Sequence, residues 1–172
     1  MRKLIFTLLS IGLLQVQAQT DFAKSYGPLL SRGFDLTIEV AEAMPENLYL
    51  YTPEKGAKPF AQQIIHSSYI CDALIDIYVH GNANRKFAEP DASKMSKAEV
   101  IAAVKGYKEA AMKHLNEITD AQLAESVKLF GQVDTNKQEC FYFVRDHMTN
   151  HRAKANLYMR IAGLNPPRYG YF

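Results

Sequence analysis

The sequence contains few of the motifs that identify common enzyme and binding folds. It has no G-x-S-x-G segment and no glycine-rich loop, so neither a serine hydrolase of that type nor a phosphate-binding loop is expected. It has no tandem repeats or low-complexity tracts, and no convincing run of alternating β-branched residues. With a length of 172 residues, these absences favour one all-α domain.

Cysteine is also scarce. Only Cys71 and Cys140 occur, and they are not in C-x-x-C spacing, which makes a zinc ribbon a poor candidate. In an exported protein two such residues could form a disulfide.

The first eighteen residues differ from the rest of the chain. A basic start at residues 2–3 precedes an apolar run at 4–14, and Val16-Gln17-Ala18 supplies a small-x-small cleavage pattern. This is the layout of a secretory signal peptide, and the apolar run is too short to span a bilayer. A buried N-terminal helix is the alternative. We predict a signal peptide at residues 1–18, cleaved after Ala18.

Cleavage would leave an exported domain, periplasmic or secreted, at residues 19–172. The full chain has 20 basic and 18 acidic residues. Because Arg2 and Lys3 belong to the signal, the mature chain has 18 of each and is formally neutral. This balance argues against a nucleic-acid-binding surface. We expect a small-molecule partner and no stable membrane anchor after cleavage; a homodimer is compatible with the sequence.

Four segments have apolar residues recurring at three and four positions, the pattern of amphipathic helices. Their starts and stops are given by caps and breakers. The predicted helices run from Thr20-Asp21 to before Pro45, from Pro59 to Gly81, from the capping box Ser96-Lys97-Ala98-Glu99 to about Thr119, and from Thr135 or Asn136 to Gly163. Residues 82–95 suit a long crossover, and 121–134 a short helical turn and a connection. The predicted fold is therefore a four-helix bundle with a long crossover between the second and third helices.

The last predicted helix carries His147 and His151. Their spacing of four residues puts both rings on one helix face, where they can bind one metal ion. The pair alone is a weak signal, because surface or core histidines often have this spacing. The intervening Met-Thr-Asn contains no glutamate, so the H-E-x-x-H metalloprotease arrangement is disfavoured.

A third ligand would come from another helix. His80 adjoins a helix end, and His114 lies in a polar stretch. His66 lies mid-helix beside Ile64 and Ile65, so we expect it to face inward. An inward histidine needs partners for its nitrogens, and a metal ion would satisfy one of them.

The tail contains His147-Met-Thr-Asn-His-Arg152, then Tyr158-Met-Arg160, Gly163-Leu-Asn-Pro-Pro167 and Tyr169-Gly170. It resembles the C-terminal signature of the DinB-like (damage-inducible) superfamily, in which H-x-x-x-H-R is followed by Y-x-R-x-x-G and P-P. The segment Phe60-Ala-Gln-Gln-Ile-Ile-His66 looks like the family's second-helix segment, which ends in its first metal histidine. The resemblance extends over about residues 21–172.

The resemblance implies a four-helix bundle with a metal site on His66, His147 and His151, usually occupied by zinc or nickel. It leaves coordination positions for water or substrate. Such a site supports hydrolysis by an activated water or attack by a thiolate. Some members are transferases or isomerases that use small cytosolic thiols, which an exported protein would not meet. The leading hypothesis is a metal-dependent hydrolase or thiol transferase. The alternatives are a non-catalytic exported protein that binds metal or a small ligand, and a structural bundle with an empty site.

Other residues have two interpretations each. Arg152 would contact an anionic substrate or, more simply, pair with an acid on the bundle surface. Tyr69 and Tyr158 would line the pocket or belong to the core. In the antiparallel pair of helices that the resemblance implies, Cys71 and Cys140 lie at similar heights on one side of the metal, which suggests a disulfide or two separate buried thiols.

Overall fold

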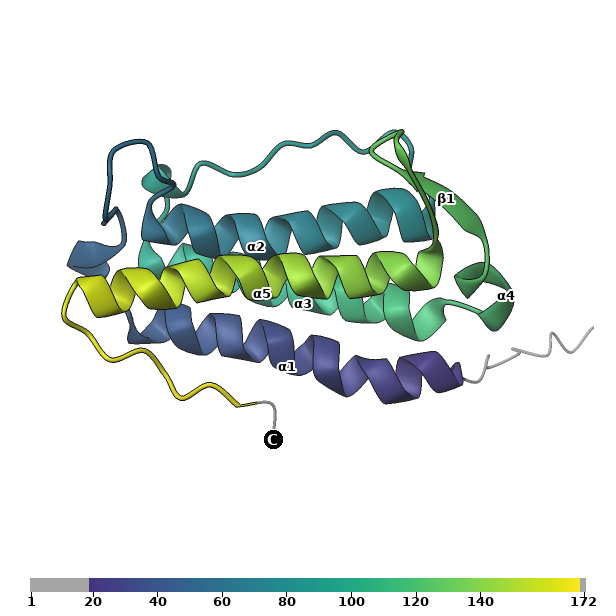
Figure 1. Ribbon diagram of the computed structural model, residues 1–172, viewed down its shortest axis with the longest axis horizontal. Helices are drawn as coiled ribbons and strands as arrows, with labels where there is room; N and C mark the ends of the chain where they lie inside the picture. The colour runs from purple at the N-terminus through teal and green to yellow at the C-terminus, as the bar shows by residue number, and fades with distance from the viewer. Residues whose placement is uncertain (1–18, 171–172) are drawn as a thin grey trace, which may run out of the picture.

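Four long helices build the molecule (Figure 1). The computed structural model describes residues 19–170, so the predicted signal peptide lies outside the described residues. The elements in chain order are α1 (Asp21–Ala43), a 3₁₀ turn (Glu46–Leu48), α2 (Phe60–Leu74), its π-helical continuation (Ile75–His80), a second 3₁₀ turn (Ala92–Lys94), α3 (Lys97–Glu117), α4 (Asp120–Leu123), β1 (Ser126–Leu129), β2 (Val133–Asn136) and α5 (Lys137–Ile161).

The helices begin and end at residues that fix their position along the chain. The predicted capping box of α3 is present, with Ser96 and Glu99 each bonding the other's backbone N–H. Asn136 and Glu139 form a second box at the start of α5. These caps satisfy N–H groups that a helix leaves without partners. The π-helical end of α2 stops at Gly81, whose φ of 88° is in the left-handed region that glycine tolerates.

The helices pack as a bundle in which α2 lies antiparallel to α5 and α1 antiparallel to α3, while α2 and α3 run parallel (Figure 1). α2 contacts both α5 and α3, and α1 packs against α3 and α5. Figure 1 shows residues 81–96 running along the outside of α2 as the long crossover. The interior contains fully buried side chains from every long helix, including Phe34, Phe60, Val104 and Met148. The predicted all-α four-helix bundle, with a long crossover between its second and third helices, is confirmed. Of the helices that the structure describes, none has the length and apolar character needed to cross a bilayer.

A β-hairpin at one end of the bundle was not predicted (Figure 1). β1 and β2 pair antiparallel, from Ser126 opposite Asn136 to Leu129 opposite Val133. Each strand has only four residues, too few to show an alternating pattern in the sequence. Phe130 and Gly131 turn the chain with φ of 53° and 70°. The predicted irregular connection is wrong here, although the predicted short helical turn before it is present as α4.

Of the two alternatives for the cysteines, a disulfide or two separate buried thiols, the structure has the second, with Cys71 and Cys140 both free and buried. The sulfur of Cys71 donates to the backbone oxygen of Val144 at 3.0 Å. Val144 lies one turn beyond Cys140, about 6 Å along the axis of α5. Cys71 therefore faces the next turn of α5. Burial raises the pKa of both thiols, that of Cys140 to about 11, so both stay protonated near neutral pH.

Candidate metal centre

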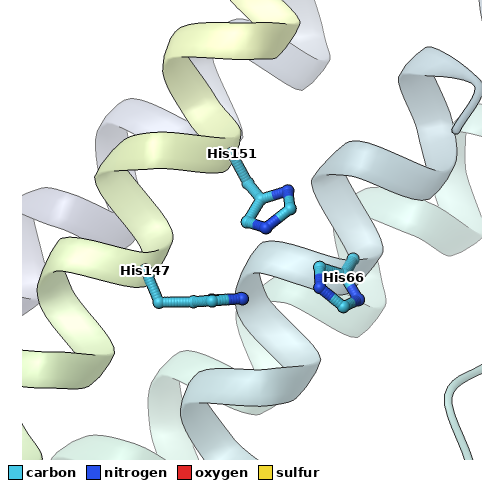
Figure 2. A group of neighbouring side chains, drawn as sticks. All are labelled: His66, His147 and His151. Carbon is cyan, nitrogen blue, oxygen red and sulfur yellow. The ribbon is translucent and has the colours of Figure 1, made fainter. Parts of the chain in front are cut away.

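Three histidines meet between α2 and α5 (Figure 2). His66 comes from α2, while His147 and His151 lie one turn apart on α5. The ring centroid of His66 is 5.1 Å from that of His147 and 4.5 Å from that of His151. The ring centroids of His147 and His151 are 4.5 Å apart. One ring nitrogen from each residue lies within 4.8 Å of the other two. The structure therefore brings together the three residues named from the sequence.

The crossover supplies a partner for His66. Nδ1 of His66 lies 2.6 Å from Oε2 of Glu89, and the two side chains are 19% and 22% exposed. Because an ionised carboxylate only accepts hydrogen bonds, Nδ1 must carry the proton. Nε2 then keeps its lone pair for an ion. A carboxylate behind a metal-binding histidine is a common way to fix ring orientation and increase ligand basicity.

An amide plays the same part for His151. Nδ1 of His151 lies 2.7 Å from Oε1 of Gln63, and Nε2 of Gln63 donates to the hydroxyl of Tyr158 at 3.2 Å. Gln63 is only 5% exposed. Because the amide nitrogen is used by Tyr158, its oxygen is oriented to accept the proton on Nδ1 of His151. This pairing again leaves Nε2 of the histidine as a lone-pair donor.

His147 completes the set differently. Its Nδ1 is buried and has no hydrogen-bond partner among the residues that the structure describes. Buried polar atoms without partners are rare, and an ion or ordered water at the ring would account for one. With two oriented rings and a third that is under-satisfied, the donor set fits a divalent ion that accepts imidazole ligands, such as zinc or nickel.

The environment keeps the two α5 rings neutral. Burial lowers the pKa of His147 to about 4, with a smaller effect from His66. Burial also lowers the pKa of His151 to about 3, assisted by His147 and His66. Lys154 lowers both pKa values further. A histidine must be unprotonated to bind a metal, so both rings are in the binding form at neutral pH.

These pKa values predict how the metal-free protein responds to acid. An unfolded chain binds protons at its histidines near the ordinary pKa of about 6.5, whereas the folded rings do so only near 4 and 3. Between these limits the unfolded state binds more protons, so stability falls as pH falls from about 6.5 toward 4. We expect the Tm of chelator-treated protein to drop by about 5 °C between pH 7 and pH 5.

Differential scanning calorimetry on metal-stripped protein measures this drop. The matched control is His147→Leu/His151→Leu, which has neither titrating ring and should show a clearly smaller shift over the same pH range. Equal shifts in the two proteins would mean that these histidines do not carry the acid sensitivity.

Three other residues were named from the sequence as possible pocket residues: Tyr69, Arg152 and Tyr158. Arg152 is only 2% exposed and donates to the backbone oxygen of Gly33 on α1 at 3.1 Å. It therefore tethers α5 to α1 and does not lie on the bundle surface; a contact with an anionic substrate stays a prediction. One residue beyond His151, a side chain is rotated by about 100° around the helix. This rotation carries Arg152 away from the metal centre.

The two tyrosines have different roles. The hydroxyl of Tyr69 accepts from the backbone N–H of Ala88 at 2.6 Å, so this core aromatic fixes the crossover one residue before Glu89. Tyr158 is buried but lies near the histidines, because its hydroxyl accepts from Gln63. The two remaining histidines, His80 and His114, contact each other with ring centroids 4.5 Å apart and planes tilted by 38°, and they are not among the three that converge.

Comparison with known proteins places this architecture in a family. A family model described as the DinB superfamily matches residues 29–155. The chain belongs to the DinB superfamily. A DinB-like protein from Bacillus subtilis has 17% sequence identity and a TM-score of 0.68, with 87% of this chain and 98% of that chain covered. A DinB-like protein from Bacillus cereus has 18% identity and a TM-score of 0.65, with 90% and 100% covered. A search of curated proteins finds no match.

DinB-like proteins often bind metal, and the three-histidine group of this DinB-superfamily chain could hold an ion. Sequence reasoning missed the two residues that orient the rings. Gln63 had a signal, since it lies one turn before His66 on the same predicted helix and within the motif Phe60–His66. Glu89 had none, because it lies in a polar crossover with no fixed spacing to any histidine.

Proposed function

We propose that this protein is an exported metal-dependent enzyme, a hydrolase or a thiol transferase, with one zinc or nickel ion held by His66, His147 and His151. The observation that carries the proposal is the convergence of three histidine nitrogens within 4.8 Å, with the far nitrogens of two rings already paired to Glu89 and Gln63. Such pairing is typical of histidines that bind metal. Export rests on the predicted signal peptide at residues 1–18.

The protein's own residues determine what an ion could do here. When bound, a divalent ion supplies a Lewis acid that lowers the pKa of a coordinated water or thiol. Because the three ligands are neutral imidazoles, they do not cancel the ion's charge. Glu89 holds the proton on Nδ1 of His66, and Gln63 accepts the proton of His151. These contacts fix both rings before substrate arrives. Hydrolysis suits an exported protein better than transfer from a cytosolic thiol.

One observation favours a non-catalytic alternative, an exported bundle that binds metal or a small ligand. Glu89, the carboxylate beside the rings, already accepts hydrogen bonds from His66 and Gln62 and lies 3.8 Å from the ammonium of Lys58. A carboxylate in this position serves to orient a ligand and has little freedom to take a proton from substrate. Catalysis would then depend on the ion alone.

The test is a screen for turnover that depends on the metal. Purified protein loaded with zinc or nickel would be assayed with 4-nitrophenyl esters, with amino-acid anilides, and with glutathione plus 1-chloro-2,4-dinitrobenzene. We expect turnover in one of these classes, a loss of about 100-fold or more after chelation, and recovery on reloading. Turnover that survives chelation would refute the metal-dependent mechanism. Loaded protein without turnover in any class would favour the non-catalytic alternative.

A further inference from the structure

A cavity of about 480 Å³ lies beside the histidines, between the C-terminal half of α5 and the loop that leads into α2. Its volume is that of a pocket for a small organic molecule. The residues that matter to its chemistry are Lys58, Gln63, Lys154, Leu157, Tyr158 and Ile161.

The cavity adjoins the metal centre through Gln63. Gln63 lines it and also bonds Nδ1 of His151. On α5, Lys154 follows His151 by three residues, and Tyr158 and Ile161 follow at further steps of four and three. Residues with this spacing share a helix face. A helix rises 1.5 Å per residue, so Lys154 is about 5 Å and Ile161 about 15 Å along the axis from His151.

Two lysines, Lys58 and Lys154, border the cavity near the histidines. Within the described chain, no carboxylate lies at ion-pair distance from Lys154, and this side chain is exposed. Lys58 is 45% exposed and approaches Oε1 of Glu89 at 3.8 Å, a loose contact that leaves its other donors available. Glu54 is the one carboxylate on the lining, so the lysines are in excess.

The far end of the cavity is apolar. Leu157 and Ile161 are 51% and 53% exposed, and both border the cavity together with the ring of Tyr158. Exposed aliphatic side chains are ordinary when they are scattered singly. Here two of them lie four residues apart on one helix and border one cavity, which is the arrangement of a binding site for an apolar group.

We propose that this cavity binds an amphipathic organic anion, with its carboxylate at Lys58 and Lys154 near the histidines and its apolar body along Leu157, Tyr158 and Ile161. The inference rests on the proposed function, because it makes this anion the substrate class of the metal centre. Such a substrate carries its negative charge within about one helical turn of the reacting group.

Octanoate and octanamide are suitable probes, since they match in shape and differ in charge. Calorimetric titration of metal-loaded and metal-stripped protein would measure the binding of each. We expect octanoate to bind three- to tenfold more tightly than octanamide in both forms, because two partly exposed lysines each contribute a modest amount. Lys58→Gln/Lys154→Gln should remove this preference. Lys24→Gln/Lys113→Gln, which removes two exposed lysines elsewhere, should keep it.

A second variant tests the apolar end. Leu157→Ser/Ile161→Ser should weaken octanoate and octanamide by the same factor and leave the preference for charge intact. The proposal is overturned if neither probe binds, if both bind equally to the unaltered protein, or if the lysine variant keeps the preference. It is also overturned if sedimentation shows a dimer that Leu157→Ser/Ile161→Ser splits, because the occupant would then be a second copy of the chain.

Failure of the proposed function gives a different result. If the protein holds no metal and turns over no substrate, yet binds octanoate through Lys58 and Lys154, then the anion site stands and the enzymatic proposal falls. If metal and turnover are present and the lysine variant binds and reacts unchanged, then only the anion site falls.

Discussion

Replacing the two α5 histidines with alanine should reduce bound metal from about one ion per chain to nearly none. His147 and His151 supply two of the three ring nitrogens that lie within 4.8 Å of one another. His66 alone cannot hold a divalent ion, because a stable zinc site needs at least three protein ligands. Elemental analysis of desalted protein, purified after growth with added zinc or nickel, gives the ratio directly. A double variant that keeps its ion would place the metal elsewhere on the chain.

A variant of Glu89 should weaken metal binding without removing a ligand or disturbing the fold. Glu89→Gln keeps the shape of the side chain but removes the charge that accepts the proton of His66. We expect metal affinity to fall about 10- to 100-fold, with the capacity of one ion retained at saturating metal. Glu109→Gln, an exposed acid on α3, is the matched control and should bind as the unaltered protein does. Circular dichroism would show whether each variant keeps its helices.

The three histidines could be predicted because the sequence near each one indicates where its ring points. His147 and His151 share a face through their spacing, and His66 had an apolar setting that faced it inward. Whether these faces meet depends on how α2 and α5 align along the bundle. The resemblance to DinB-like proteins supplied that alignment. The orienting residue Glu89 depends on the path of a polar crossover held by Tyr69, which no periodicity in the sequence describes.

The helix ends were predictable for the same local reason. A capping box such as Ser96–Glu99 and a left-handed glycine such as Gly81 act within one turn of the chain. The hairpin of residues 126–136 was not predictable, because its two strands pair only with each other and are too short for a pattern. A disulfide would need Cys71 to face Cys140, but Cys71 faces Val144, one helical turn further along α5. The sequence does not determine the alignment of α2 and α5 to within one turn.

Replacing Arg152 has the largest expected effect on stability. It also tests whether this side chain tethers α5 to α1 or contacts an anionic ligand. Arg152→Met should lower the free energy of unfolding by about 2–4 kcal/mol, because it removes a buried donor and leaves the backbone oxygen of Gly33 without this partner. For a chain of this size the Tm should fall by roughly 5–15 °C. Metal content should stay at the unaltered level, since the guanidinium points toward α1 and the histidines face α2.

Arg160→Met is the matched control, since Arg160 is an exposed arginine on the same helix. A surface change of this kind should alter stability by no more than about 0.5 kcal/mol. Thermal unfolding and octanoate binding, measured on both variants, decide between the two roles of Arg152. A lower Tm with unchanged binding supports the tether between α5 and α1. An unchanged Tm with weakened octanoate binding would mean that Arg152 contacts the anion, as one of its two interpretations from the sequence holds.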